Sequence, residues 1–512
     1  IIMGNLGLES FYSIGILVLI LSHLLLPLML FFINDKYVRC YSIIIGSLIG
    51  AFSIFLAFSY YYNPNINLFT FNLNLFGLDY VFRIDNFNYA LVLLNGLITF
   101  AVPLATHIKD RERDFYVLAF LVLFGTVGLF LVQNMLLFVL FYELASVPMY
   151  FLIANWGSLG LTPFRKVEPK YAAMKLFLYL QLGGVLVMLG FFILHSQVFP
   201  NDLFGGWNFA DYEEILKTNG YLVSKELAIF LFILFFIAFG IEAALVPFHT
   251  WLPDGHSAAP SSISMILAGI LLKMGTYGIL RIPFVFFNEA LSTLSLIFIF
   301  WGLLNMFWGA FNAYRQIDFK YLIAYSSISH MGVIFMGIAS NNDIGISAAI
   351  FQMVSHGLIS AAMFSIAGSF QYRTNTRILD NYGGLLRVMP FIGAILVFTS
   401  MANLGLPGLS GFVSELLGIS ASFKAIPIPY LKIIFIIFAL ASIFITTVYV
   451  INMLEKILYR KIKIEHYELK DAMWDEKLHL LVLATFILLL GIYPRIITDL
   501  SNLYKIKEII GL

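Results

Sequence analysis

Long apolar stretches alternate with short polar ones along the whole chain of 512 residues. An α-helix rises about 1.5 Å per residue, so roughly 20 apolar residues are needed to cross the hydrocarbon core of a bilayer. The stretches that meet this length lie at 11–33, 41–62, 87–106, 115–132, 134–154, 171–196, 227–249, 259–280, 291–312, 321–339, 344–369, 388–419, 430–454 and 478–498. The pattern predicts an all-α polytopic membrane protein with about fourteen transmembrane helices.

The composition supports this class of protein and limits the chemistry that the chain can carry out. Hydrophobic residues make up 61% of the chain and charged residues only 12%, against roughly 25% charged in soluble domains. The net charge of +1 gives no support for binding nucleic acid. The single cysteine, Cys40, cannot by itself hold an Fe–S cluster or a Cys-based zinc site. We therefore expect no cofactor in this chain and place any redox chemistry in partner chains.

The basic residues indicate how the helices are oriented. Alternate connections, beginning with the one between the first two spans, hold nineteen of the 30 Lys and Arg residues. By the positive-inside rule these connections, including RERD (111–114) and KILYRKIK (456–463), face the cytoplasm or matrix. Both termini are then expected on the opposite side. The start of the chain has no basic segment, so we expect the first apolar stretch to be a retained span rather than a signal peptide.

Two predicted spans are interrupted in the same way. Span 7 contains Pro247, and span 12 contains NLGLPGLSG (403–411) around Pro407. Because the two breaks are five spans apart, they predict two five-helix repeats of inverted topology, spans 4–8 and 9–13. A proline kink without function is the alternative for each break alone. The expected segments are 1–114 (spans 1–3), 115–285 (first repeat), 286–456 (second repeat) and 457–512 (basic loop, span 14 and tail).

Charged residues within the spans are the candidate functional residues. They are Glu143, Lys175, Glu242, Lys273 and Glu415. Each charge costs about 2.5–3.5 kcal/mol at the centre of a membrane helix, so five unpaired charges would cost on the order of 15 kcal/mol. Burial favours the neutral form of acids and lysines, which lets such groups exchange protons near neutral pH. The pattern predicts a proton or ion pathway.

Two histidines extend this series. His330 in SSISHMG and His356 in QMVSHGLIS lie on neighbouring predicted spans, between Lys273 and Glu415 in chain order. A single membrane histidine is often a packing residue, but two on consecutive spans favour a proton relay. His249 and His256 flank the span-7 break, and their spacing is not that of a helical zinc pair. No Walker A motif supports nucleotide-driven transport.

Five blocks of the chain carry a family resemblance. They are ELASVPMYFLIANWG (143–157), VPFHTWLPDGHSAAPSSISMILAGILLKMGTYGILR (246–281), DFKYLIAYSSISHMG (318–332), QMVSHGLISAAMF (352–364) and LPGLSGFVSE (406–415). These blocks closely resemble the M-type (chain 4) family of antiporter-like subunits of respiratory complex I. That family is related to Mrp-type cation/proton antiporters.

The resemblance implies a proton-translocating subunit of a quinone oxidoreductase, with NADH as the expected electron donor. It implies two half-channels in which Glu143 is the span-5 acid, Lys273 the central lysine, His330 and His356 the connecting histidines, and Glu415 the acid near the exit. Flavin, Fe–S clusters and quinone are expected in partner subunits. The expected neighbours are L- and N-type antiporter-like subunits, in a prokaryotic plasma membrane or the mitochondrial inner membrane.

The chain departs from the family pattern at one position. Relatives usually carry lysine five residues before the span-7 proline, where this chain has Glu242. Two acids, Glu143 and Glu242, would then face each other, and both cannot be charged cheaply in a low dielectric. The expectation is that one of them holds a proton, or that Lys175 supplies the missing positive charge. Glu242 would then carry protons itself.

Two other functions remain open from the sequence. One is a cation/proton antiporter subunit, either Mrp-like or part of a membrane-bound hydrogenase, which sodium-dependent activity would favour. The other is a structural chain retained only as a scaffold, which the loss of the family lysine mildly supports. The buried charges and both histidines argue against a scaffold, because a scaffold has no use for costly buried charges.

Overall fold

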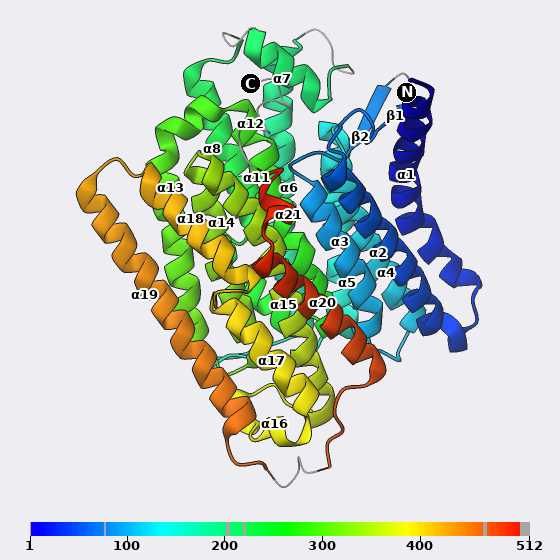
Figure 1. Cartoon of the computed structure of the whole chain (residues 1–512), viewed down its shortest axis with the longest axis vertical. Helices are drawn as coiled ribbons and strands as arrows, with labels where there is room; N and C mark the ends of the chain where they lie inside the picture. Colours follow the sequence, from blue (N-terminus) through cyan, green and yellow to red (C-terminus); the bar gives the residue numbers. More distant parts are fainter. Residues whose placement is uncertain (1, 76–77, 201–204, 219–221, 464–467, 502–512) are drawn as a thin grey trace.

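The computed structural model describes residues 2–75, 78–200, 205–218, 222–463 and 468–501 as a bundle made mostly of helices (Figure 1). The helices that run through the bundle are α1 (Ile2–Leu28), α2 (Val38–Tyr62), α3 (Tyr89–Ala105), α4 (Glu112–Leu131), α5 (Met135–Trp156), α6 (Pro169–Val198), α8 (Lys225–Glu242), α10 (Ser261–Ile266), α11 (Leu272–Arg281), α13 (Asn288–Tyr314), α14 (Phe319–Ala339), α15 (Asp343–Thr374), α17 (Pro390–Asn403), α18 (Ser410–Ala425), α19 (Pro429–Leu454) and α20 (Trp474–Ile492). Shorter helices are α7 (Phe209–Thr218), α9 (Trp251–Ala258), α12 (Pro283–Phe286), α16 (Leu385–Val388) and α21 (Arg495–Thr498).

The described helices agree with a polytopic membrane protein. Ten helical stretches are long and apolar enough to cross a bilayer, and α3 and α17 are shorter apolar helices. Each range predicted from the sequence contains a helix. The tail from residue 502 onward, part of the expected last segment, lies outside the described residues.

The first break differs from its prediction in where it begins. Helix α8 already ends at Glu242, five residues before Pro247. The stretch 250–258, expected to be a connection outside the membrane, is largely the fully buried helix α9. This is possible because the freed backbone groups are bonded within the protein. Val246 N donates to Asn305 Oδ1 at 2.7 Å, and the Trp251 indole donates to Ile241 O at 2.9 Å.

The second break follows its prediction and ends its helix in the same way. Helix α17 ends at Asn403, and α18 begins at Ser410, on either side of Pro407. After each helix, the first residue donates its N–H to the carbonyl four positions back, and the third donates to the carbonyl five positions back. The bonds are Ala243 to Phe239 (2.9 Å) and Leu245 to Gly240 (2.7 Å), and Leu404 to Ser400 (3.0 Å) and Leu406 to Met401 (3.0 Å).

The residue between those two donors is left-handed at both breaks. Ala244 has φ 58° and Gly405 has φ 70°. This is the backbone pattern of a Schellman-type helix end, in which a left-handed residue lets the chain turn away from the helix. Glu242 and Asn403 therefore occupy equivalent positions, each as the last residue of a half-helix.

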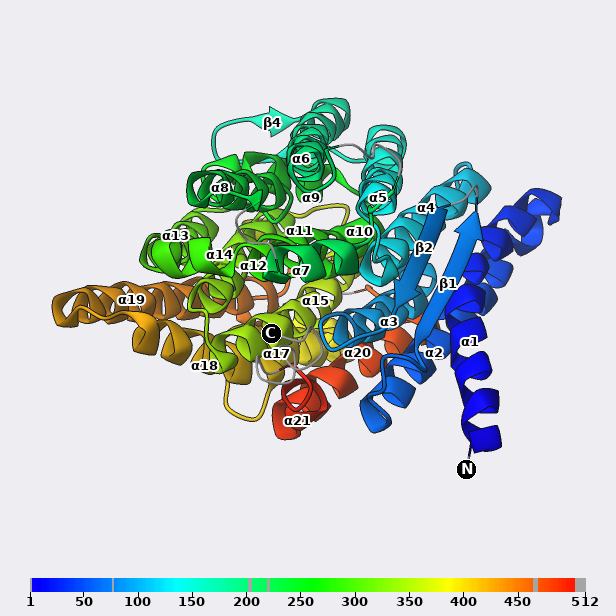
Figure 2. The same cartoon turned by 90° about the horizontal axis from the view of Figure 1, so that it is seen from above.

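The most buried segments lie in the middle of the bundle. Seen from above, α11, α14 and α15 are central, with α6 and α8 on one side and α17, α18 and α20 on the other (Figure 2). The 18-residue apolar windows within Ser261–Phe286 and Asp343–Thr374 are 100% buried and that within Phe319–Ala339 is 94% buried, against 33% for the window within Pro429–Tyr459 at the edge. Polar side chains on the central helices are thus shielded from lipid by the rest of the chain.

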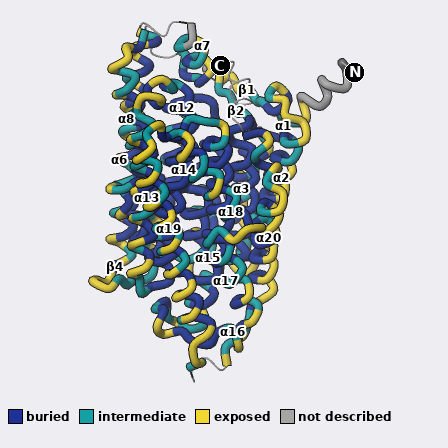
Figure 3. Tube along the Cα trace, turned by 60° about the vertical axis from the view of Figure 1, so that its left-hand side comes forward, coloured by how far each residue is buried: buried dark blue, intermediate teal, exposed yellow. Residues whose placement is uncertain are grey.

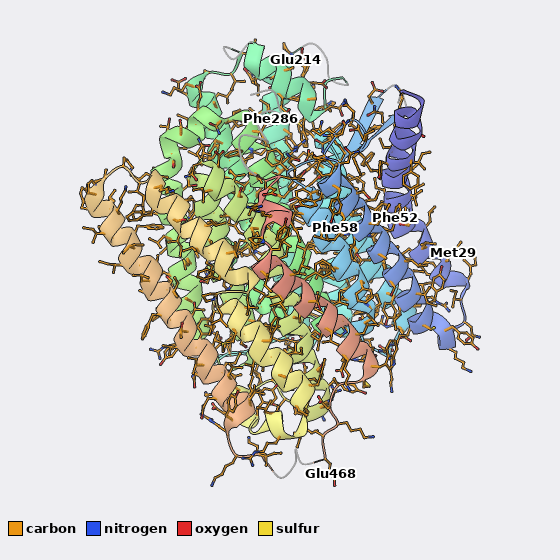
Figure 4. The ribbon with its side chains drawn as sticks, viewed as in Figure 1. Met29, Phe52, Phe58, Glu214, Phe286 and Glu468 are labelled. Carbon is orange, nitrogen blue, oxygen red and sulfur yellow. The ribbon has the colours of Figure 1, made fainter. Side chains whose placement is uncertain are left out.

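The connections between the helices fall at two opposite ends of the bundle. The antiparallel hairpin of β1 (Thr70–Leu75) and β2 (Leu78–Arg83) lies at the same end as α7, and α16 lies at the other (Figure 1). The short hairpin of β3 (Gly160–Leu161) and β4 (Lys166–Val167) lies at the α16 end (Figure 3). Glu214 and Glu468 mark the two ends, while apolar side chains such as Met29 cover the sides (Figure 4).

Helix α14 packs unusually close to α13. A Cβ at Gly332 would lie 2.5 Å from Gly302 O and 2.5 Å from Met306 N, and a Cβ at Gly302 would lie 2.8 Å from Gly332 O. Small residues of this kind let membrane helices approach closely, where dispersion forces hold them together. The contact fixes the depth and rotation of α14 two residues after His330.

We expect Gly332→Ala to lower the thermal stability of the assembled complex, since overpacking against backbone atoms costs about 1–3 kcal/mol. Gly15→Ala in α1 is the matched control, because its nearest neighbour is the flexible end of Leu56 at 3.2 Å. The stability of both variants is measured as the midpoint temperature of thermal unfolding in detergent. Equal stability of the two variants would contradict the role assigned to this helix contact.

Candidate functional site

Lys273 and His356 form a direct contact at the centre of the bundle. Lys273 is the second residue of α11, which follows the π-helical stretch Leu267–Leu271, and none of its surface is exposed. Its Nζ lies 2.7 Å from His356 Nδ1 and also donates to Ala268 O. A π-helical turn leaves a carbonyl free for another donor. The pair can therefore pass a proton between an amine and an imidazole.

His330 and Glu415 form a second contact, between α14 and α18. His330 Nδ1 lies 3.0 Å from Glu415 Oε1, and His330 Nε2 lies 2.9 Å from Asn403 Oδ1. The Gln352 amide lies 3.2 Å from the same Nδ1, and Ser414 donates to Gln352 Oε1. If Nε2–H donates to Asn403, the contact with Glu415 needs one further proton, on the imidazole or on the carboxyl group. A proton on either group would therefore join the two side chains by a hydrogen bond.

The two pairs are neighbours. The rings of His330 and His356 have centroids 5.5 Å apart at an angle of 45°. The structure therefore brings four of the predicted residues into one continuous polar line, from Lys273 through His356 and His330 to Glu415. Within the described part of the chain, no group of His, Cys, Asp and Glu has the arrangement of a metal site.

Glu143 lies at the boundary between α5 and α6. Its Oε2 accepts hydrogen bonds from the Gln181 amide and from Ser146 Oγ at 3.2 Å. Gly184 on α6 leaves the space for this carboxyl group, since a Cβ there would collide with Glu143 Oε1. The side chain is half-buried, so this end of the site faces the side of the bundle.

Glu242 is fully buried, and its carboxyl group lacks hydrogen-bond partners. Neither oxygen has one among the described residues. The Tyr142 hydroxyl lies beside it, but that hydroxyl donates to Leu180 O at 3.1 Å. Glu143 is close enough to act on it electrostatically. As the last residue of α8, Glu242 also lies at the negative end of the helix dipole, which disfavours a negative charge on its carboxyl group.

The two acids and the polar line are separate within the described residues. Helix α11 packs directly on the end of α8, because a Cβ at Gly275 would lie 2.5 Å from Phe239 O and 2.8 Å from Ala243 N. No hydrogen bond or ion pair of the described residues joins Glu242 to Lys273. Glu143 and Glu242 therefore lie on the α5–α8 side of the polar line and make no direct side-chain contact with it.

Lys175 does not supply the positive charge expected beside Glu242. Its Nζ lies 2.8 Å from Asp254 Oδ2 and donates to Thr250 O at 2.8 Å, both in the broken part of span 7. Six residues separate Lys175 from Gln181, a distance of about 9 Å along α6, so its side chain meets α9 instead of the two acids. The expectation that Lys175 neutralises Glu242 is wrong.

Several polar partners of the site were not found from the sequence. Asp254 on α9 also binds Arg165 at 2.9 Å and accepts from the Tyr321 hydroxyl at 2.8 Å. Its stretch was expected outside the membrane, so it was not counted among the buried charges. The amides of Gln181, Gln352 and Asn403 carry no charge and have no distinctive spacing. Only the matched ends of α8 and α17 point to Asn403.

The sequence is similar to known membrane proteins over most of its length. Residues 132–451 match the family described as NADH:quinone oxidoreductase/Mrp antiporter, TM. NAD(P)H-quinone oxidoreductase chain 4 of Gloeobacter violaceus is 36% identical over 430 residues, which cover 83% of this chain and 78% of the relative. NADH-quinone oxidoreductase subunit M of Escherichia coli K12 is 35% identical over 431 residues, covering 83% and 82%.

Two solved structures share the fold. A chain of respiratory complex I from Thermus thermophilus matches with a TM-score of 0.83 and 24% identity, covering 96% of this chain and 99% of that one. A chain of the Mrp complex from Dietzia sp. matches with a TM-score of 0.80 and 18% identity, covering 99% of both. With the family match over more than half of its length and relatives above 30% identity, this chain belongs to the NADH:quinone oxidoreductase/Mrp antiporter transmembrane family.

Proposed function

We propose that this chain is a proton-translocating membrane subunit of a complex I-type quinone oxidoreductase, with NADH as the electron donor of the assembled enzyme. The observation that carries the proposal is the polar line Lys273–His356–His330–Glu415 at the centre of the bundle. The names of the relatives, quinone oxidoreductase chain 4 and subunit M, support its membership of such an assembly.

The line has the chemistry that proton transfer needs. Each member can both accept and release a proton. The Lys273–His356 and His330–Glu415 contacts are no longer than 3.0 Å, and one ring rotation or one water can bridge the gap between the two histidine rings. The line ends at Glu415, whose side chain is 13% exposed. A charge arriving at Lys273 raises the cost of a proton on His356, so the proton moves on toward Glu415.

The arrangement we propose has fourteen spans and two inverted repeats. Its support is the matched backbone at the two breaks, with Glu242 and Asn403 in equivalent positions. A second parallel lies beside them: Gln181 of α6 contacts Glu143 of α5, and Gln352 of α15 contacts His330 of α14. In this scheme Glu143 and Glu242 form the first half-channel, and His330, Asn403 and Glu415 belong to the second.

Glu242 acts in this scheme as a proton carrier rather than a fixed charge. Its burial, its position at the negative end of α8 and the absence of a partner in the described residues all favour the protonated form. Glu143, which is half-buried and hydrogen-bonded, is the better site for the negative charge. When Glu143 takes up a proton, repulsion falls and Glu242 can release its own.

The assembly we propose follows from the same comparison. The chain holds no cofactor, and flavin, Fe–S clusters and quinone belong to partner subunits. Neighbours of the L and N type lie against its sides in the inner mitochondrial or prokaryotic plasma membrane. The Lys/Arg-rich end with α16 faces the matrix or cytoplasm, and both termini face the other side.

We expect Glu242→Gln to impair proton pumping severalfold while leaving assembly and quinone reduction measurable, because glutamine keeps the shape but cannot carry a proton. The measurement is proton translocation per NADH oxidised in membrane vesicles. Glu289→Gln, at the exposed first turn of α13, is the matched control. An unchanged proton-to-electron ratio in Glu242→Gln would disprove the role of this residue.

We expect Lys273→Met to stop pumping through this chain, because the amine partner of His356 is lost while the volume is nearly kept. Lys424→Met, on the exposed last turn of α18, should pump as the unchanged protein does. Proton uptake is followed with a pH-sensitive dye at matched rates of NADH oxidation. Transport that requires sodium in the unchanged protein would instead favour a cation/proton antiporter subunit.

A further inference from the structure

A second polar stripe runs from Lys273 along α11 toward the β1–β2 hairpin. Lys273, Tyr277 and Arg281 are spaced four residues apart, so their side chains share one face of the helix. None of the surface of Lys273 or Tyr277 is exposed, and Arg281 is only 1% exposed. Over these eight residues, about 12 Å, the stripe reaches the end of the bundle that holds α7 and the hairpin (Figure 1).

Arg281 ends this stripe beneath the hairpin. Its Nη1 donates to Asp85 Oδ2 at 2.9 Å, and its Nη2 donates to Gln133 Oε1. The ring centroids of Phe87 and Phe209 lie 5.3 and 5.6 Å from its Cζ. Asp85 follows β2, Gln133 precedes α5 and Phe209 begins α7, so three separate segments hold the guanidinium group in place.

The carboxylate of Asp85 is held through both of its oxygens. Its Oδ2 also forms an ion pair with Arg83 Nε at 3.6 Å, and its Oδ1 accepts from the backbone N–H groups of Phe87 at 3.0 Å and Asn88 at 3.3 Å. Arg83 in turn donates to Gln133 Oε1 at 3.1 Å. Two guanidinium groups therefore share one carboxylate and one amide oxygen.

This cluster of two guanidinium groups, one carboxylate and one amide has the chemistry of a proton barrier. A proton relay needs groups that both accept and release protons, whereas a guanidinium group is always protonated and has five N–H donors and no acceptor. The excess positive charge also repels a proton that leaves Lys273. Glu213 of α7, the next acid in electrostatic range, is partly exposed, so water and salt screen its charge.

The stripe needs a barrier because a proton carrier must not be open to both sides of a membrane at once. Tyr277, midway along the stripe, has a hydroxyl group that can accept and donate, and this group donates to Phe130 O at 3.1 Å. A guanidinium group beyond it interrupts the stripe. The proton of Lys273 is then directed to His356, the next member of the polar line.

We propose that Arg281 is the proton barrier that closes Lys273 off from the α7 end of the bundle, so that protons cross only along the polar line. The proposal rests on the proton-translocating function given above and adds the group that prevents protons from flowing back past Lys273. Asp85 and Gln133 are positioning residues, which hold the guanidinium group across the stripe. Arg281 itself carries no proton through the chain.

The test is the passive proton leak of the assembled complex in liposomes, without NADH and with a potential imposed by potassium and valinomycin. Arg281→Gln should raise the leak severalfold, because an amide both accepts and donates. Arg281→Lys keeps a cation that only donates and should stay as tight as the unchanged protein. Arg495→Gln, at the exposed first residue of α21, is the matched control and should also stay tight.

Asp85→Asn separates a barrier from loosened packing. It breaks the same ion pair but leaves the positive charge, so a barrier predicts a tight protein, while a merely structural ion pair predicts the same leak as in Arg281→Gln. If Arg281→Gln does not assemble because Asp85 is left buried without its partner, Arg281→Gln/Asp85→Asn removes both charges and should leak. A tight protein in whichever of these two assembles would overturn the barrier, and so would an equal leak in Asp85→Asn.

Lys273→Met shows whether the leak follows the stripe. Added to Arg281→Gln, it should restore a tight protein, because the leak passes through the lysine, and a leak that persists would contradict the proposal. The single variant keeps this test apart from the proposed function. Normal pumping by Lys273→Met would disprove that function and the barrier with it, whereas a tight Arg281→Gln beside an inactive Lys273→Met would disprove the barrier alone.

Discussion

A polar group inside a membrane protein must find its partner within the protein, and this constraint shapes the whole chain. Lipid offers no hydrogen bond to a charge or to a free backbone group. The chain therefore places Lys273, His330 and His356 on α11, α14 and α15, which the surrounding helices shield almost completely. Lys273 and His356 satisfy each other there. Glycines such as Gly332 bring the helices close enough for such contacts to be made.

The two broken helices meet the same constraint in two ways. At the first break, α13 supplies partners: Asn305 accepts from Val246 N, and the Trp301 indole donates to Val246 O at 2.6 Å. At the second break, the end of α17 carries an amide, Asn403, which binds His330 and Ser326. The equivalent position in α8 carries Glu242, an acid without such partners among the described residues. That contrast makes Glu242 suited to exchanging a proton and Asn403 suited to holding a neighbour in place.

Helix α20 contacts the last turns of α15 at one end and the second helix break at the other, two regions that the polar line does not join. Its first turn carries Glu476, which pairs with Arg373 of α15, and near its other end Gly491 packs directly on Gly408 and Leu409 of the second break. The helix crosses the bundle obliquely between these points (Figure 1). The helix therefore holds the last turns of α15 and the second break at a fixed separation, since packed helices shift as units more readily than they deform.

The sequence by itself determined the class of the molecule, the positions of the helices, the two breaks and the charges that form the polar line. Each of these features can be read along the chain, because the length of an apolar stretch, the presence of a proline and the cost of a charge in the bilayer do not depend on which helices pack together. Only the tertiary structure decided which charges meet. Lys175 was expected beside Glu242 and instead pairs with Asp254, since a side chain reaches only its own level on a helix face. Uncharged partners such as Gln181 and Asn403 have no charge to mark them as functional, and their role depends on which helices pack side by side.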